Sequence, residues 1–458
     1  MSPRRLSSTS FALLALAITF LGSLPAAAQG LVPAFVQPTP YSANVLPYEP
    51  IRLTYDTPID TTSFSGAVFR VYGSQGGLYE GTLSYDEATL TVIYTLPCAM
   101  REGERVSVTV SGIRALSGAS QAPFQWQFVP AAAYGSGRFE GPDVFSLGAG
   151  DAPVHLYAGD LDGDLLPDAV VANSGSNSIA IYLNQGSRPR RYSQRIDVRV
   201  GSGPYAISGG DWNADGAVDL VVSNLLESTL TLVFNDGNGL FSTQTLDTGE
   251  RPVRTAVGDF DNDGDQDIAV SAFGVDQIYV HLNNGDGTFA PPAVYDVGAS
   301  PAGLVAGDFD NDGFLDLYAA SLGDQRLDYL HNDGTGAFEP TVTTPLPFSP
   351  AAIEAADVLS ADTTRYGDAR LDLVVSAQDS RNVVVLQNTG NGAALQLSQA
   401  LPVDSTSSQA LALVVADIDS TDALGAFRGL GQDFDLDVVT AHLADGEIRH
   451  SEYRRPGV

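Results

Sequence analysis

Four acidic nine-residue loops recur along the chain at nearly constant spacing, and they constrain the fold more than any other feature. They start at Asp160, Asp211, Asp259 and Asp308 and read DLDGDLLPD, DWNADGAVD, DFDNDGDQD and DFDNDGFLD. The starts lie 51, 48 and 49 residues apart, which indicates an internal repeat. Carboxylates at positions 1, 3, 5 and 9 of one short loop repel one another unless a cation lies between them. The loops therefore predict a hard cation with oxygen ligands, and we expect Ca²⁺ at about four sites.

The predicted metal ligands are the side chains at positions 1, 3, 5 and 9 of each loop. They are Asp160, Asp162, Asp164, Asp168, Asp211, Asn213, Asp215, Asp219, Asp259, Asp261, Asp263, Asp267, Asp308, Asp310, Asp312 and Asp316. A weaker fifth copy starts at Asp357 and has Leu359 at position 3, so we do not predict a metal there. A sixth copy starts at Asp417 and is interrupted by a long insertion, which leaves its metal binding open.

An EF-hand loop opens with the same spacing of acids, but two features argue against it. An EF-hand needs a bidentate Glu at position 12, flanked by helices. Position 12 is valine in the first three loops and Ala319 in the fourth, and the flanking residues are rich in β-branched side chains. The acid at position 9 is therefore the expected closing ligand.

Other sequence columns repeat with the loops. A Gly-x-x-Pro turn precedes each of the four, a β-branched run such as DLVVS follows, and an Asn-x-Gly turn closes the unit. These closing asparagines are Asn184, Asn235, Asn283, Asn332 and Asn388. Apolar residues alternate or form short blocks without a helical period, which predicts about four short strands per unit.

These columns resemble FG-GAP/VCBS-type repeats, the units of integrin-alpha-like β-propellers, from about Phe139 to the C-terminus. The resemblance implies an all-β fold in which residues 133–458 form a propeller of six four-stranded blades. Seven blades remain an alternative if residues before Phe139 complete another blade with C-terminal help. The resemblance also implies Ca²⁺ in a hairpin loop of each metal-bearing blade. The aromatic residues at position 2 of three loops, Trp212, Phe260 and Phe309, are expected to pack between blades.

The N-terminal part has a different composition. Arg4 and Arg5 precede an apolar run of about fourteen residues, and an Ala-rich stretch precedes Gln29, so residues 1–28 are expected to form a signal peptide. The run is shorter than the roughly twenty residues that span a bilayer. Residues 29–132 alternate apolar and polar side chains and resemble a bacterial Ig-like β-sandwich, expected to serve as a spacer or docking module. We therefore expect an exported protein that is secreted, attached to the cell surface or periplasmic.

The chain carries a formal charge of −32 and contains no lysine. Nucleic acid is therefore not an expected partner, because binding it requires clustered cations. Adaptation to high salt and a biased genome composition both remain possible explanations of the acidity. The single cysteine, Cys98, lies in an apolar stretch and is expected to be a buried thiol.

Three function classes follow. We favour a calcium-stabilised extracellular recognition or adhesion module that binds a glycan or a protein. The alternatives are a lectin-like sugar-binding propeller and a secreted polysaccharide-active enzyme, a lyase or a hydrolase. The sequence contains no nucleophile elbow, zinc spacing or phosphate loop. His281 and His331 are expected to be structural, because other copies have ordinary strand residues at these positions. The ligand and oligomeric state are not predicted.

Overall fold

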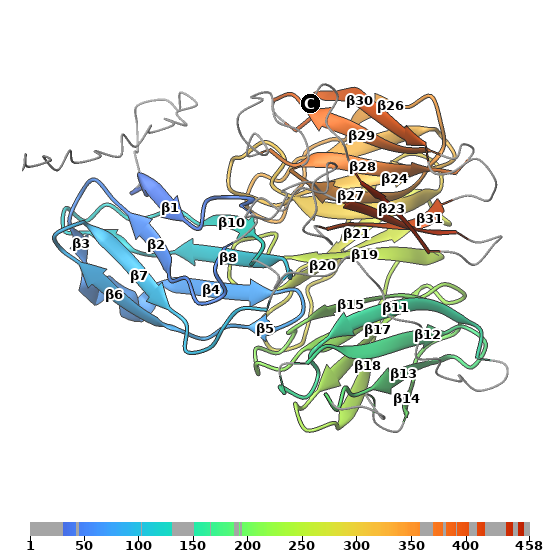
Figure 1. Ribbon diagram of the computed structural model, residues 1–458, viewed down its shortest axis with the longest axis horizontal. Helices are drawn as coiled ribbons and strands as arrows, with labels where there is room; N and C mark the ends of the chain where they lie inside the picture. Colours follow the sequence, from blue (N-terminus) through green and yellow to red (C-terminus); the bar gives the residue numbers. More distant parts are fainter. Residues whose placement is uncertain are drawn as a thin grey trace, which may run out of the picture.

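The computed structural model shows an all-β protein with two parts (Figure 1). It describes residues 31–42, 45–101, 103–130, 151–164, 166–186, 192, 195–357, 370–378, 382–390, 392–402, 410–416, 437–442 and 448–452. The predicted signal peptide and the inserts of the fifth and sixth loop copies lie outside these residues. Among the described residues, no helix is long and apolar enough to cross a membrane.

The N-terminal part contains two four-stranded antiparallel sheets. The first has the strand order β1 (Phe35–Gln37), β2 (Ile51–Thr54), β7 (Thr91–Thr95) and β6 (Thr82–Asp86). The second has the order β10 (Phe124–Phe128), β8 (Val106–Ser111), β4 (Val68–Gly73) and β5 (Gly77–Leu78). Strands β3 (Ile59–Asp60) and β9 (Arg114–Ala115) form a small third sheet, and one 3₁₀ turn, η1, spans Thr61–Gly66.

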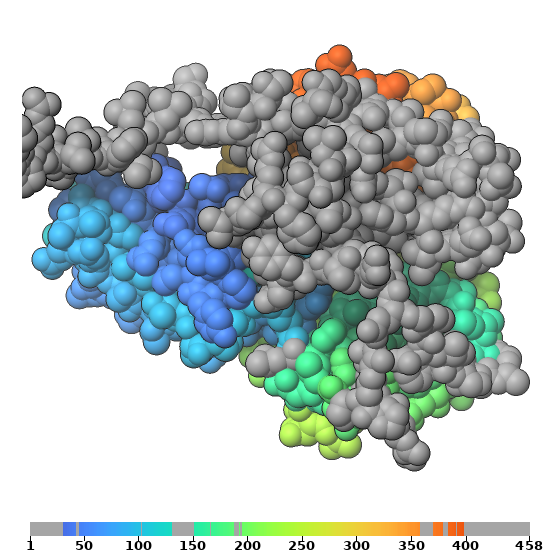
Figure 2. All heavy atoms as spheres, viewed as in Figure 1, coloured from blue at the N-terminus to red at the C-terminus, as the bar shows by residue number. Residues whose placement is uncertain are grey.

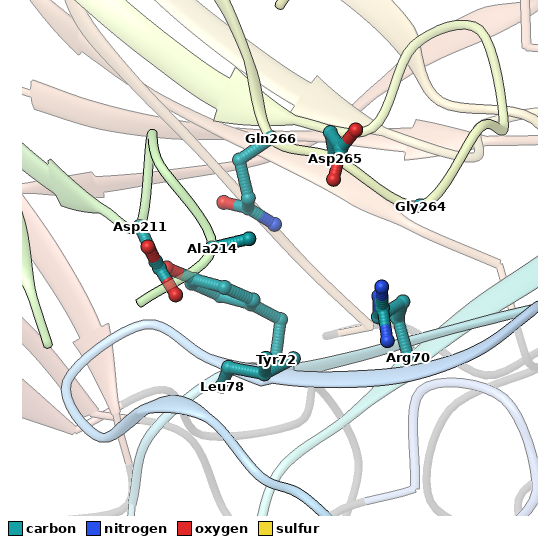
Figure 3. A pocket seen from close by; sticks show the side chains of 8 residues that line it. All are labelled: Arg70, Tyr72, Leu78, Asp211, Ala214, Gly264, Asp265 and Gln266. Atoms are coloured by element: carbon teal, nitrogen blue, oxygen red, sulfur yellow. The ribbon is translucent and has the colours of Figure 1, made fainter. Parts of the chain in front are cut away.

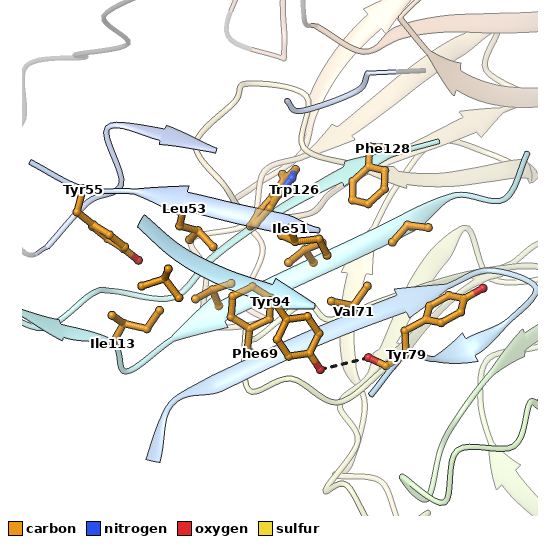
Figure 4. Packing of buried hydrophobic residues seen from close by; sticks show 14 of the residues in the cluster. Ile51, Leu53, Tyr55, Phe69, Val71, Tyr79, Tyr94, Ile113, Trp126 and Phe128 are labelled. Atoms are coloured by element: carbon orange, nitrogen blue, oxygen red, sulfur yellow. Dashed lines mark hydrogen bonds between the residues drawn. The ribbon is translucent and has the colours of Figure 1, made fainter. Parts of the chain in front are cut away.

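Alternating side chains build the N-terminal core, as the sequence pattern predicted. Val71, Val108 and Trp126 point inward from neighbouring strands of the second sheet and are buried with Leu53 and Tyr94 of the first (Figure 4). The residues between them in sequence lie on the opposite face of the second sheet. One expectation for this part is wrong: Cys98 is exposed, because the short loop that carries it follows β7 at the edge of the core.

Six consecutive antiparallel sheets form the blades of the propeller. The first blade contains β11 (Pro153–Gly159), β12 (Asp168–Asn173), β13 (Ser178–Tyr182) and β14 (Ile196–Arg199). The second contains β15 (Pro204–Gly210), β16 (Asp219–Asn224), β17 (Thr229–Asn235) and β18 (Phe241–Asp247). The third contains β19 (Pro252–Gly258), β20 (Asp267–Ala272), β21 (Gln277–His281) and β22 (Ala293–Asp296).

The remaining blades follow the same plan. The fourth contains β23 (Pro301–Gly307), β24 (Asp316–Ser321), β25 (Arg326–Leu330) and β26 (Val342–Pro345). The fifth contains β27 (Pro350–Ala356), β28 (Asp372–Ala377), β29 (Asn382–Asn388) and β30 (Leu395–Pro402). The sixth has three strands among the described residues, β31 (Ala410–Ala416), β32 (Asp437–His442) and β33 (Ile448–Glu452). The first strand of each blade lies beside the first strand of the next.

Residues at position 2 of the loops fill the space between blades, as expected. Trp212 is fully buried with apolar residues of the second and third blades, and Phe309 is buried with residues of the fourth and fifth. Each acidic loop joins the first two strands of its blade, so position 9 is also the first residue of the second strand. The expected strand flanks are confirmed.

Candidate metal loops and their contact with the N-terminal domain

The closing acid at position 9 ties each loop to its blade. Asp219 accepts hydrogen bonds from the backbone N–H of Trp212, at 3.1 Å, and of Asn235, at 2.7 Å. The same pair of bonds recurs at Asp168, Asp267 and Asp316. These carboxylates are buried, so they organise the loop even before any ion is considered.

The closing asparagine links neighbouring blades. The side-chain amide of Asn332 donates to the backbone carbonyl of Phe260, at 2.7 Å, in the loop of the preceding blade. It also donates to the carbonyl of Leu315 in its own loop, at 3.0 Å. Asn235, Asn283 and Asn388 make the corresponding bond to the preceding loop. From the sequence, these asparagines were predicted only to form turns. Their regular spacing was the one sequence feature that pointed to a common role, the hydrogen bond between neighbouring blades.

Acids of three loops come close together. In the third loop, Asp259, Asp261 and Asp263 each offer an oxygen within 4.8 Å of the others. Corresponding groups in the first and fourth loops include the closing acid: Asp160 with Asp162 and Asp168, and Asp308 with Asp310 and Asp316. The second loop supplies no such acidic group among the described residues, since Asn213 stands at its position 3. All sixteen predicted ligands therefore lie in these four loops, and three loops bring acids into a tight cluster.

The clustered acids have perturbed pKa values. Burial, together with neighbouring carboxylates, raises the pKa of Asp259 to about 7. Burial also raises the pKa of Asp219 to about 7 and that of Asp168 to about 6. Asp259 is 4% exposed, and its Oδ1 accepts no hydrogen bond from a described residue. A buried carboxylate oxygen without a partner is costly, and a bound cation would satisfy it.

His331, which was expected to be a structural residue, lies beside the acids of the fourth loop. Its Nδ1 lies 3.2 Å from Asp316 Oδ1 and 3.3 Å from Asp310 Oδ2. The hydrogen bond to Asp316 raises its pKa to about 9. The one sequence feature that pointed to this contact is that His331 directly precedes a closing asparagine. His281 is fully buried in its blade, and burial lowers its pKa to about 4, as fits a structural residue.

The outer face of the second N-terminal sheet contacts the loops, which the sequence did not predict. Figure 2 shows the N-terminal part, in blue, against the first blades of the propeller, in green. Arg70, Thr109 and Gln125 are paired in register across β4, β8 and β10 and form one row on that face. Thr109 Oγ1 donates to Asp259 Oδ2 at 2.8 Å, and Gln125 Nε2 donates to the Asp259 carbonyl at 2.7 Å. Two side chains of the row therefore bind one predicted ligand, Asp259, through its carboxylate and its backbone carbonyl.

The other loops are contacted as well. Arg101 forms an ion pair with the Asp160 carboxylate. The backbone N–H of Asp160 also donates to the Gln75 carbonyl at 3.0 Å. The hydroxyl of Tyr41 donates to the Asp308 carbonyl at 2.6 Å. Position 1 of the first, third and fourth loops thus touches the N-terminal domain directly.

Tyr72 approaches the second loop. It lines a small pocket with Arg70, Asp211 and Gly264, and its ring extends toward the Asp211 carboxylate (Figure 3). Tyr72 is 9% exposed, and its buried hydroxyl has no hydrogen-bond partner among the described residues. Burial and the charge of Asp211 raise the pKa of this phenol well above its usual value.

Gly264, at position 6 of the third loop, shows how close the two parts lie. Its φ of +99° is a conformation that side chains disfavour, and a Cβ there would come 2.8 Å from Val68 Cγ1. Glycine at this position therefore permits both the loop turn and the close approach of β4.

Comparison with known families identifies four FG-GAP-like repeats, at residues 160–222, 211–270, 259–319 and 308–360. Each match begins at the first acid of a loop, so the predicted repeats are confirmed for these units. The expected Ig-like identity of residues 29–132 is not supported by the comparisons. No curated protein matches the chain.

Three solved structures illustrate the structural similarity. A structure of BBS1N in complex with ARL6DN has 15% identity, a TM-score of 0.43, and coverage of 78% of this chain and 89% of that chain. The periplasmic gluconolactonase of Pseudomonas aeruginosa has 14% identity, a TM-score of 0.39, and coverage of 73% and 96%. A putative 6-phosphogluconolactonase from Bacteroides fragilis has 14% identity, a TM-score of 0.34, and coverage of 67% and 84%.

Proposed function

We propose that this chain is an exported calcium-binding β-propeller that serves as an extracellular recognition or adhesion module for a glycan or protein ligand. The observation that carries the proposal is the third loop. Three carboxylates converge there, and one buried oxygen, Asp259 Oδ1, has no partner among the described residues. An all-oxygen set of this charge suits Ca²⁺ better than softer metals, which prefer nitrogen or sulfur ligands.

The acids at positions 1, 3 and 5 are the principal proposed ligands. In the third loop each of these three acids offers an oxygen within 4.8 Å of the others, whereas both oxygens of Asp267 at position 9 already accept backbone hydrogen bonds. An oxygen that accepts one hydrogen bond still has a second lone pair, so Asp168 and Asp316 can contribute to the clusters in which they lie. Bound calcium would favour the ionised form of Asp259, whose pKa is raised by burial and by the neighbouring acids, and would stabilise the folded state.

The proposed recognition surface is the propeller face opposite the acidic loops, because residues of the N-terminal domain contact the loops of the first, third and fourth blades. This opposite face carries the turns between the second and third strands of each blade. Leu226 in one turn is 75% exposed. In the next turn, the Arg251 guanidinium lies 5.0 Å from the ring centroid of Phe273. Exposed apolar side chains beside planar cationic groups suit protein surfaces and sugar rings.

The proposal is tested by calcium titration of the purified protein, with bound metal counted and thermal unfolding followed with and without chelator. Glycan arrays and binding assays with candidate extracellular proteins then test recognition, with Leu226→Asp as the surface variant and Leu240→Asp, in an exposed turn of the loop side, as its control. We expect about four ions, a higher melting temperature in calcium, and loss of ligand binding only in Leu226→Asp. Absence of calcium binding would contradict the metal assignment. Cleavage of a polysaccharide in a matched screen would favour the enzymatic alternative.

A further inference from the structure

We propose that the N-terminal domain positions the metal loops, so that calcium binding by the propeller and docking of this domain are one coupled equilibrium. The inference rests on the proposed calcium-binding function and adds its regulation. It assigns positioning roles to Thr109 and Gln125, which are not proposed as metal ligands but form hydrogen bonds to Asp259, which is.

The first support is the way the row grips Asp259. Thr109 binds one carboxylate oxygen, and Gln125 binds the backbone carbonyl of the same residue. Gly264 N–H donates to the oxygen that Thr109 also contacts, at 3.1 Å. The two donors to Oδ2, Thr109 and Gly264, leave Oδ1 of the buried carboxylate without a partner among the described residues. The N-terminal domain therefore fixes which oxygen is presented to an ion.

The second support is that the same row spans two loops. The backbone N–H of Gln125 donates to the Gly313 carbonyl of the fourth loop at 3.1 Å, and its side chain lies 3.3 Å from Asn262 Oδ1 of the third loop. A Cβ on Gly313 would come 3.0 Å from the ring of Phe124. The start of β10 therefore contacts both the third and the fourth loop in their folded conformation.

Charge supplies the coupling. Without a cation, the acids at positions 1, 3 and 5 repel one another and favour an open loop, which moves position 1 away from Thr109 and Gln125. With a cation, the loop adopts the closed shape that the row recognises. Thermodynamic reciprocity then requires that docking raise calcium affinity by the same factor by which calcium favours docking.

The affinity arm of the test compares matched variants. Thr109→Val and Gln125→Leu remove a donor to the third loop, and each is expected to weaken calcium binding at one site by about fivefold or more, the lower range of measured couplings. Thr109→Ser keeps the hydroxyl and should restore the affinity. Gln127→Leu is the control, because this amide lies on the same strand but donates to Ser107 within its own domain. Isothermal titration calorimetry supplies the affinities, and unfolding in chelator shows whether the variants are equally stable without metal.

The docking arm uses the exposed native thiol Cys98 and a second thiol introduced by Ser242→Cys on exposed β18. Spin labels on both allow the distance between the two parts to be measured in the full chain by double electron–electron resonance. We expect a narrow distribution in calcium and a broad one in chelator. Equal distributions, with calcium binding intact and Gln125→Leu binding as tightly as the parent, would overturn the coupling while leaving the proposed function standing. A chain that binds no calcium at all would instead refute the proposed function, and the coupling with it.

Discussion

The hydroxyl of Thr109 donates a 2.8 Å hydrogen bond to Asp259 across 150 residues of sequence, joining the N-terminal sheet to the third acidic loop. Both residues are buried, so water does not compete for this bond. A buried bond to a carboxylate is worth more than one between neutral groups at the surface. The contact makes the first acid of the loop a shared residue of two domains.

Asp263→Asn should lower the melting temperature in calcium and change it little in chelator. The side chain is exposed, and its Oδ1 accepts from the Asp265 N–H at 2.9 Å, a bond that asparagine can keep. The substitution therefore removes charge without removing the turn. Thermal unfolding in both conditions checks this expectation, and an equal loss in chelator would show that the residue serves the turn alone.

Asp267→Ala should destabilise the protein by about 2–4 kcal/mol in calcium and in chelator alike. It removes the acceptor of two backbone N–H groups, those of Phe260 and Asn283, in a fully buried setting. Urea unfolding at a fixed pH measures the difference. A loss confined to calcium would mean that this closing acid acts as a metal ligand without a structural role.

Asn332→Ala should cost about 2–3 kcal/mol independently of calcium, because two buried backbone carbonyls lose their donor. Asn284→Ala is the matched control, since this asparagine of the preceding blade is exposed and its side chain donates to Thr288 of its own turn. Chemical unfolding of the two variants distinguishes an inter-blade role from a turn preference. Similar losses in both would contradict the inter-blade role.

Tyr72→Phe should change stability differently in the metal-free and calcium-bound protein. In chelator, removal of a buried hydroxyl without a partner should raise stability by about 1 kcal/mol. In calcium, the gain should disappear if the phenol oxygen is satisfied when the loop closes around an ion. Melting curves in the two conditions give the comparison. A gain of the same size in both would show that Tyr72 only packs against Asp211.

The metal-free protein should melt at a lower temperature at pH 8 than at pH 5. The pKa values of Asp168, Asp219 and Asp259 are raised from 3.8 to about 6 or 7, mainly by burial, so the folded state holds more protons than the unfolded state between these limits. This contribution is complete below the unfolded value of 3.8 and is lost as the pH rises through 6 to 7. Calcium should reverse the order, because the ion binds the ionised acids. Melting in chelator that is independent of pH would contradict the raised values.

The sequence was sufficient for much of the propeller. Asp219 starts a strand at the end of its loop, and Trp212 packs between blades, because both features depend on local pattern and on the repeat. The contact between domains was not predictable in the same way. Thr109 and Gln125 alternate with core residues, which is also the pattern of a solvent-facing sheet surface. Only the placement of distant segments shows that this face is covered. The contacts of His331 were not predictable for a related reason, since its partners Asp310 and Asp316 belong to a loop that precedes it by more than a strand.

The row of Arg70, Thr109 and Gln125 also bears on how the chain assembles during synthesis. The N-terminal domain is made first, whereas its contact on the fourth loop, Gly313, follows almost two hundred residues later. Throughout that interval the row has only water as a partner. Hydroxyl, amide and guanidinium groups are well hydrated, so the waiting domain exposes no sticky surface to a crowded surrounding. A polar contact face thus allows the domain to stay soluble until the later blades have been synthesised and can dock against it.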